Sequence, residues 1–245
     1  MNNLNKSFVK LKVSKNQKTN KVQNIFTNVT KKYDLMNDLM SFGTHRIWKK
    51  TFIEIMNIQN NDVIIDVGSG TGDLTKEIQK NNSKVSIVSI DLNYDMLKYN
   101  KNNYKNYIKK GIWINCNAEN LPFKNNVFDK YITSFCFRNV TSIEKAILEA
   151  LRVLKSGGIF YCLEFSTPEN PLIKKIYNYY KKTIIPFMGE KIANNKNAYI
   201  YLEQSINQFP HQDILLSNLK KLGFSNTSYI NLFNGIVSIH KGYKI

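Results

Sequence analysis

The chain has 245 residues, enough for one large domain with a sizeable core, and a formal net charge of +17. No apolar run has the length of a transmembrane helix, and the N-terminus lacks the apolar segment of a signal peptide. The three cysteines form no CxxC pair, which disfavours a zinc site or a disulfide framework. We therefore expect a cytoplasmic protein with reduced thiols.

Residues 1–21 are expected to form a basic, flexible arm ahead of a single domain over residues 22–245. The first 33 residues contain eight lysines and no acid. Such a run attracts the anionic inner face of a membrane, but it is equally common on solvated surfaces, and both alternatives stay open. Nucleic-acid binding is disfavoured, because base readers rely on arginine forks and the chain has only three arginines.

Helices are predicted over residues 22–57. Val22, Ile25, Phe26 and Val29 begin this region with helical spacing. Residues 32–50 then mix apolar and polar side chains too densely for a plain surface helix. This segment is expected either to pack in the core or to form a helical lid over the active site, and its spacing is compatible with both.

From residue 62 onward, strands and helices alternate. The predicted strands cover residues 63–67, 84–91, 111–115, 128–135 and 159–165, and the predicted helices 73–80, 94–104 and 143–154, the last stopping at Gly157-Gly158. Three further helices (172–185, 196–207, 213–222) precede two strands (228–233, 236–243) that meet at Asn234-Gly235, a strong hairpin signal. This order predicts a Rossmann-like α/β fold, with helices on both faces of a seven-stranded, mostly parallel sheet that has one antiparallel strand.

The most informative motif is Asp66-Val67-Gly68-Ser69-Gly70-Thr71-Gly72-Asp73, directly after the first strand. Its glycines let the chain turn and let a ligand approach the backbone, and the following helix offers unpaired N–H groups. A dinucleotide fold needs the spacing G-x-G-x-x-G, but Asp73 stands where its third glycine belongs. The spacing G-x-G-x-G favours S-adenosylmethionine as the cofactor and disfavours an NAD-dependent oxidoreductase.

Polar residues follow the other predicted strands. Asp91 ends the second strand, where a carboxylate can accept hydrogen bonds from both ribose hydroxyls, although it is also placed to cap the next helix. Asn117-Ala118 follows the third strand and would lie beside an adenine ring. Asp66 is expected either to organise the glycine turn or to face the amino group of the cofactor.

The fourth strand ends near Ser134, and Arg138-Asn139 follows shortly after. In this fold, that end of the strand faces the methyl group that is transferred. Arg138 and Asn139 are therefore candidates for contact with the substrate. The alternative for Arg138 is a structural ion pair with a surface acid.

Together these residues resemble the UbiE-type C-methyltransferases of ubiquinone and menaquinone biosynthesis, which are class I S-adenosylmethionine-dependent enzymes. The resemblance runs from about residue 22 to the C-terminus. The glycine motif is shared by many methyltransferases, whereas the Tyr-Asp-Leu-Met-Asn block at Tyr33, the Arg-Asn-Val turn at Arg138 and the His-Lys-Gly-Tyr tail at His240 are more specific. The matching blocks are Lys32–Lys50, Asp66–Asp73, Asn115–Phe123, Ser134–Val140, Leu154–Ser166, Tyr199–Gln212 and Gly235–Lys244.

The resemblance implies S-adenosylmethionine as methyl donor, no metal, and a polyprenylated quinol drawn from the membrane as acceptor. For this reaction we expect a catalytic role for Arg138, which would hold the developing charge on the quinol oxygen or position a water. Tyr33, Asn37 and His45 would line the acceptor side. The cofactor contacts implied by motif are Thr71, Asp91, Asn117 and Ala118, with Ser134 closing the site. Methylation of oxygen or nitrogen on another small molecule remains the alternative, and the choice between benzoquinol and naphthoquinol, like the oligomeric state, stays open.

Three departures from the family pattern change the shape expected of the site. Gly68-Ser69 stands where the family usually has Ala-Gly. Cys136 and Phe137 replace a glycine and a leucine, and Thr44 replaces an apolar residue.

Overall fold

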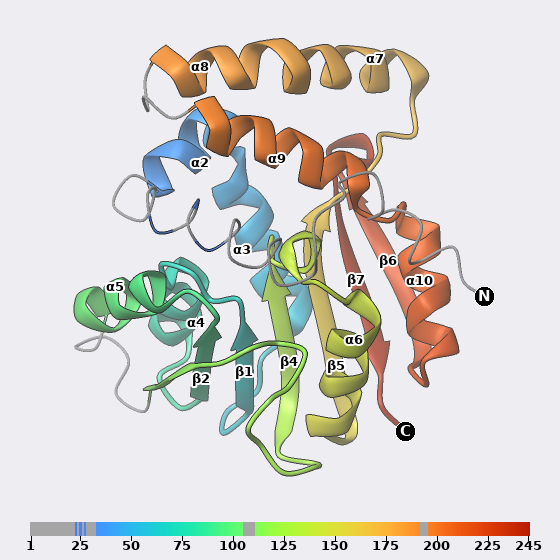
Figure 1. The fold of residues 1–245 in the computed structure, drawn as a ribbon. Helices are drawn as coiled ribbons and strands as arrows, with labels where there is room; N and C mark the ends of the chain where they lie inside the picture. The colour runs from blue at the N-terminus through green and yellow to red at the C-terminus, as the bar shows by residue number, and fades with distance from the viewer. Residues whose placement is uncertain (1–22, 24, 26, 28–32, 105–110, 192–195) are drawn as a thin grey trace.

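The structure is a computed structural model that describes residues 23, 25, 27, 33–104, 111–191 and 196–245. The basic arm (residues 1–21) and most of the first predicted helix lie outside the described residues. The centre of the molecule is a twisted seven-stranded sheet with the strand order β3-β2-β1-β4-β5-β7-β6 (Figure 1). This confirms the predicted fold class.

The sheet consists of β1 (Val63–Val67), β2 (Ser86–Asp91), β3 (Gly111–Asn115), β4 (Phe128–Ser134), β5 (Leu154–Phe165), β6 (Ser225–Leu232) and β7 (Val237–Tyr243). Strands β1 to β5 pair in parallel, whereas β7 runs antiparallel to both β5 and β6. The order of the strands reverses between β1 and β4. Ligands of such sheets bind where the carboxyl ends of the strands diverge at this point.

Alternate residues of the strands face two separate cores, because successive side chains point to opposite sides of a sheet. On one face, α3 (Thr44–Met56) and α4 (Asp73–Asn81) bury Trp48, Phe52 and Met56 against the strands. On the other face, α6 (Ile143–Val153) and α10 (Gln212–Lys221) cover the second core. Helix α5 (Tyr94–Tyr104) connects β2 to β3. The second half of the segment 32–50 therefore packs in the core.

A further layer of helices lies beyond the carboxyl ends of the strands (Figure 1). It contains α2 (Tyr33–Ser41), α7 (Pro171–Tyr179), a π-helical turn η3 (Tyr180–Ile184), α8 (Ile185–Lys191) and α9 (Lys196–Gln208). A third core cluster holds this layer together, with Ile185 of α8 packed among apolar side chains of α9. None of the described helices has the length and apolar character needed to cross a membrane.

The predicted boundary between α6 and β5 is wrong. Helix α6 ends at Val153, and β5 already begins at Leu154, which pairs with Phe128 of β4. Gly157 lies inside β5 with φ +79°, and its N–H donates to the carbonyl of Lys244 at 2.8 Å. The register of the β4–β5 pair shifts after Phe128, so these glycines form an irregular strand rather than a helix end.

Candidate active site

The glycine motif forms a tight turn at the end of β1. Gly68, Gly70 and Gly72 all have positive φ values, of +73°, +54° and +84°. Side chains with a Cβ rarely adopt this conformation, so the turn depends on glycine. The N–H of Gly68 donates to the carbonyl of Ile90 at 2.9 Å, which ties the turn to the end of β2.

Two of these glycines leave space for different neighbours. A Cβ at Gly68 would stand 2.1 Å from Sγ of Cys136, so the missing side chain accommodates that cysteine. A Cβ at Gly70 would meet nothing within 4 Å, so this glycine faces open space. At Gly68, the atoms that approach the backbone closely are therefore those of Cys136. At Gly70, the space beside the backbone is open to a ligand.

Gly68→Ala is expected to lower the free energy of unfolding. Overpacking costs about 1–3 kcal/mol, and the left-handed backbone adds about 1 kcal/mol. The double variant Gly68→Ala/Cys136→Gly should recover the first part, because the new methyl group then has room. Urea unfolding of the four proteins of this double-mutant cycle measures the coupling. If the two single substitutions change the free energy of unfolding additively, a direct contact between residues 68 and 136 is contradicted.

A cavity of about 830 Å³ opens beside the turn, and we call it the glycine-side cavity. A smaller cavity of about 330 Å³, the Asp66 cavity, adjoins it and shares Gly68, Gly70 and Ser134 with it. Between them, the two cavities bring together all residues that the sequence assigned to the cofactor. Those on the glycine-side cavity are Gly68, Gly70, Asp91, Asn117, Ala118 and Ser134, and Asp66 and Thr71 are on the Asp66 cavity.

Asp91 is held by backbone N–H groups at the rim of the glycine-side cavity. Its Oδ2 accepts from Gly70 N and its Oδ1 from Asn93 N, both at 2.8 Å. Burial raises the pKa of Asp91 to about 6. The helix-capping alternative for Asp91 is wrong, because Oδ1 of Asn93 accepts from Met96 N at 3.0 Å and so caps α5.

Asp66 lies deeper, at 1% exposure, and its Oδ2 accepts from the hydroxyl of Thr75 at 2.6 Å. Burial raises its pKa to about 7, and the nearby carboxylates of Asp73 and Asp91 add to this effect. Asp66 thus connects the end of β1 to α4 rather than capping the glycine turn itself.

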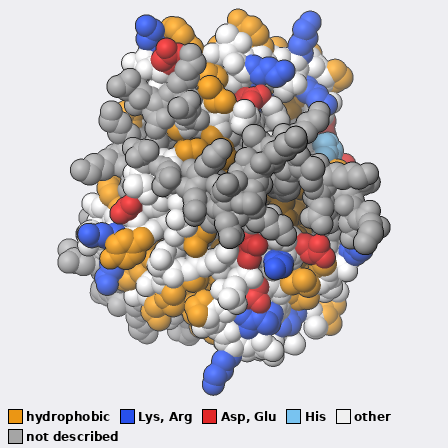
Figure 2. All heavy atoms as spheres, in the orientation of Figure 1, with side chains coloured by type: hydrophobic (Ala, Val, Ile, Leu, Met, Phe, Trp, Pro, Cys, Tyr) orange, Lys and Arg blue, Asp and Glu red, His pale blue; other side chains and the backbone are white. Residues whose placement is uncertain are grey.

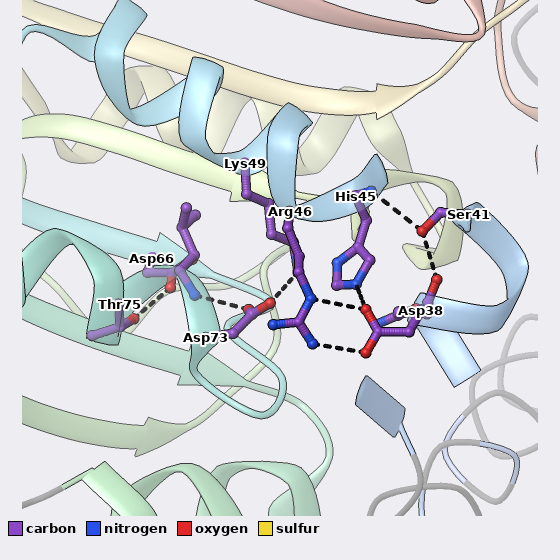
Figure 3. Close-up of polar contacts among 10 residues, drawn as sticks. Asp38, Ser41, His45, Arg46, Lys49, Asp66, Asp73 and Thr75 are labelled. Atoms are coloured by element: carbon purple, nitrogen blue, oxygen red, sulfur yellow. Dashed lines mark hydrogen bonds and ion pairs between the residues drawn. The ribbon is translucent and has the colours of Figure 1, made fainter. Parts of the chain in front are cut away.

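An ion pair that the sequence did not reveal closes the Asp66 cavity. Lys49 of α3 reaches Asp73, the first residue of α4 (Figure 3). Burial alone would raise the pKa of Asp73, but the ammonium group of Lys49 brings it below its ordinary value. The sequence contained one indication of a special role for Asp73, because this acid stands where a dinucleotide motif has its third glycine.

A third cavity, of about 550 Å³, lies between the sheet and the outer helix layer, and we call it the apolar cavity. It brings together Asn37, His45 and Arg138, three of the predicted acceptor-side residues. Its apolar lining comprises Met40, Trp48, Phe135, Phe165, Ile185, Leu202, Ile206 and Ile236. Tyr33 begins α2, but its side chain lies outside the described residues. Asn139 lies instead on the glycine-side cavity, where its Oδ1 accepts from the hydroxyl of Tyr201 at 2.9 Å.

Phe135 lines all three cavities. It follows β4 with φ +54°, an unusual conformation for a bulky residue and one that often marks a functional site. Sequence reasoning did not single out Phe135, because the chain gives no signal for a positive φ at a phenylalanine.

Arg138 is a partner of a buried acid. Its Nη1 donates to Oε1 of Glu164 at 2.8 Å, and its backbone N–H donates to Oε2 at 3.3 Å. Glu164 has no exposed surface, so the expected surface acid is wrong, and the pair is buried within the fold. Burial raises the pKa of Glu164, while Arg138 opposes that rise. The sequence contained one indication of this ion pair, because Glu164 is an acid within the otherwise apolar end of β5.

His45 and Arg46, adjacent at the start of α3, both bind the carboxylate of Asp38 in α2 (Figure 3). The contact from Nε2 of His45 to Oδ1 is 2.8 Å, and Arg46 binds both oxygens at 2.9 and 2.7 Å. Arg46 holds the pKa of Asp38 far below its usual range, so this carboxylate is an acceptor only. Nε2 of His45 therefore carries the proton, and Nδ1 has the lone pair.

The other side of the His45 ring is unpartnered. Nδ1 is buried and has no hydrogen-bond partner within the part of the chain that the structure describes. Burial lowers the pKa of His45 below 6.5, although the hydrogen bond with Asp38 opposes this. His45 is thus a neutral imidazole on the wall of the apolar cavity at neutral pH.

Residues 12–244 match the model of the ubiE/COQ5 methyltransferase family. The chain belongs to this family. This makes it a methyltransferase, and the NAD-dependent alternative is wrong.

Close relatives of this ubiE/COQ5 family methyltransferase carry one name, ubiquinone/menaquinone biosynthesis C-methyltransferase UbiE. The protein from Rickettsia bellii is 44% identical and that from Rickettsia prowazekii 45% identical, each with both chains covered completely. The one from Wigglesworthia glossinidia brevipalpis is 45% identical over 95% of this chain and 94% of its own.

Solved structures with much lower identity share the fold. A Thermotoga maritima S-adenosylmethionine-dependent methyltransferase, described as a possible histamine N-methyltransferase, has a TM-score of 0.65 at 15% identity, with 91% of this chain and 100% of that one covered. A Haemonchus contortus phosphoethanolamine N-methyltransferase, solved with S-adenosylmethionine, has a TM-score of 0.62 at 13% identity, covering 80% of this chain and 52% of its own.

Proposed function

We propose that this protein is an S-adenosylmethionine-dependent C-methyltransferase of quinone biosynthesis. Its acceptor is the ring carbon of a polyprenylated quinol, either demethylmenaquinol or 2-methoxy-6-polyprenyl-1,4-benzoquinol, or both. The observation that carries the proposal is the meeting at Phe135 of the glycine-side cavity, which holds the polar residues of the glycine turn and strand ends, with the apolar cavity. A charged nucleotide-like donor fits the first cavity and a lipophilic ring fits the second. The names of the relatives point to the same reaction.

The residues of the glycine-side cavity fit S-adenosylmethionine. Gly70 lines this cavity and leaves open space beside the backbone. Oγ of Ser134 is buried there without a hydrogen-bond partner among the described residues, so a ligand atom would satisfy it. Asp91 would accept from the ribose, and Asn117 and Ala118 would contact the adenine. When bound, S-adenosylmethionine supplies an electrophilic methyl group on a sulfonium.

The apolar cavity would hold the quinol ring and the first part of its tail. Trp48, Phe135 and Phe165 offer aromatic surface, with ring centroids 4.8 to 6.1 Å apart. Such walls exclude water and hold the ring in one orientation, which matters because methyl transfer to carbon depends on alignment.

We assign proton removal to His45. C-methylation replaces a ring hydrogen, so a proton must leave the quinol for a base. Nδ1 of His45 carries a lone pair, and His45 lies on the wall of the apolar cavity. Asp38 fixes the tautomer and would stabilise the imidazolium after proton transfer, and Arg46 keeps Asp38 ionised and in place, so both are positioning residues. Arg138 also lines this cavity, and its contact with the quinol oxygen stays a prediction.

Incubation with methyl-labelled S-adenosylmethionine and each demethylated quinol tests this function. We expect label on a ring carbon of at least one quinol, since the proposed acceptor site selects a ring rather than an amine. Mapping the label by NMR decides between carbon and oxygen. Label on oxygen, or transfer to neither quinol while S-adenosylmethionine binds, would reject the proposed acceptor.

A further inference from the structure

The outer side of the α7–α8 segment exposes a row of large apolar side chains. Leu172, Ile176 and Tyr179 of α7 are 66%, 61% and 63% exposed, and Phe187 of α8 is 61% exposed. We call these four residues the outer stripe. Folded proteins usually bury side chains of this size, and a row of them marks an interaction surface.

The stripe is a product of the helix geometry. Leu172, Ile176 and Tyr179 have the i, i+4, i+7 spacing of one helix face. The π-helical turn Tyr180–Ile184 then joins α7 to α8, where Phe187 is exposed. Such turns are rare and often occur at functional sites.

Lysines outnumber acids around the outer stripe. Residues 169–191 contain five lysines and two acids, Glu169 and Glu190, which lie at the two ends of the segment. Lys174, Lys175 and Lys182 are exposed, whereas Nζ of Lys181 points inward and donates to Oδ1 of Asn207 at 2.7 Å. In Figure 2, the upper edge, where Figure 1 shows α7 and α8, carries hydrophobic and basic side chains together with a few acidic ones.

The inner side of the same helices lines the apolar cavity. Tyr177 of α7 and Ile185 of α8 are both buried and both contribute to its wall. One helical segment therefore separates that cavity from the outer stripe. A ligand that binds the stripe lies one helix away from the proposed acceptor site.

We propose that the outer stripe binds the surface of an anionic phospholipid bilayer, with α7 and α8 lying in the plane of the interface. An apolar helix face with flanking lysines is the pattern of interfacial helices, and the positive charge complements anionic headgroups. A protein partner would be expected to meet a pattern of polar groups as well, but the stripe itself is apolar, and around it five lysines outnumber two acids, Glu169 and Glu190. The role in substrate access rests on the proposed function, whereas membrane binding itself does not.

Flotation with vesicles tests the apolar contribution. The full chain is mixed with vesicles of phosphatidylcholine alone or with about one third phosphatidylglycerol, without methyl donor or quinol. We expect the double variant Ile176→Gln/Phe187→Gln to bind the anionic vesicles at least tenfold more weakly than the wild type. The matched control Leu148→Gln/Ile214→Gln changes side chains that are 44% and 52% exposed on α6 and α10, and it should bind like the wild type.

Charge variants test the source of the attraction. Lys175→Gln/Lys182→Gln should weaken binding to anionic vesicles about tenfold and leave binding to neutral vesicles unchanged. The control Lys98→Gln/Lys101→Gln removes the same charge from α5. If Lys6→Gln/Lys10→Gln/Lys12→Gln in the N-terminal arm abolishes binding while the stripe variants bind normally, the arm is the membrane site and the proposal fails.

Three further results would overturn the proposal: no binding of the wild type to anionic vesicles, stripe variants that bind like the wild type, or stripe variants whose only change is a lower oligomeric state in light scattering. The last result would identify a second copy of the chain as the occupant. Thermal unfolding of each variant checks its fold. Vesicle binding without methylation of any quinol would reject the proposed function but leave this inference standing.

Discussion

His45→Gln is expected to lower kcat by about 10²–10⁴-fold, the usual contribution of a general base. Glutamine can keep the hydrogen bond to Asp38 at the position of Nε2, but it offers no base at the position of Nδ1. The affinity for S-adenosylmethionine, measured by calorimetry, should stay within about twofold, since His45 lines only the apolar cavity. A kcat equal to that of the wild type would remove His45 from the chemistry.

The pH dependence of kcat gives an independent check. Burial lowers the pKa of His45 below 6.5, so the neutral base is lost only when the pH falls through a value below 6.5. The charges facing the ring are Asp38 and Asp73, which raise its pKa, and Lys49, which lowers it. Asp38→Asn should therefore move the acid limb of kcat to lower pH and reduce the plateau, because the tautomer is no longer fixed. An unchanged acid limb would contradict the assignment.

Arg138→Met is expected to reduce the free energy of unfolding by about 3–5 kcal/mol, since it leaves the carboxylate of Glu164 buried without its partner. Turnover would fall as well, so a loss of activity alone says nothing about catalysis. Urea unfolding of Arg138→Met and of Arg138→Met/Glu164→Gln separates the two roles, because the second variant has no buried charge and should recover most of the stability.

The protonation of Glu164 determines how the stability of Arg138→Met changes with pH. Without the guanidinium, burial keeps the folded-state pKa of Glu164 above its unfolded value. The loss of stability should be small below the ordinary glutamate pKa and should grow as the pH rises above it. Wild-type stability at neutral pH together with lost turnover would instead support the catalytic role that the sequence suggested.

The residues around the proposed cofactor could be predicted because each lies at, or just beyond, the carboxyl end of a strand of a parallel sheet. Asp66, Asp91 and Ser134 are distant in the chain, but the carboxyl ends of parallel strands meet at one edge. The glycine turn was predictable for a similar reason, since its backbone conformation requires glycine at fixed positions.

The contacts that determine protonation could not be predicted. Asp38 meets His45 only because the chain turns between α2 and α3, and Glu164 meets Arg138 across two neighbouring strand ends. Side-chain pairing of this kind depends on the three-dimensional packing of helices whose relative positions the sequence pattern does not give. The same holds for Leu154, where pairing with β4 overrides the helical pattern.

The space at Gly68 also constrains how this sequence can have arisen. In the family resemblance, alanine is usual at residue 68 and glycine is usual at residue 136, so by that pattern a methyl group at 68 has been exchanged for a side chain at 136. Because a Cβ at residue 68 would overlap Sγ of Cys136, the cysteine costs less stability if the alanine methyl is lost first. The reverse order passes through an intermediate with both groups in one volume, and a reconstructed ancestor with glycine at both positions is the expected stepping stone.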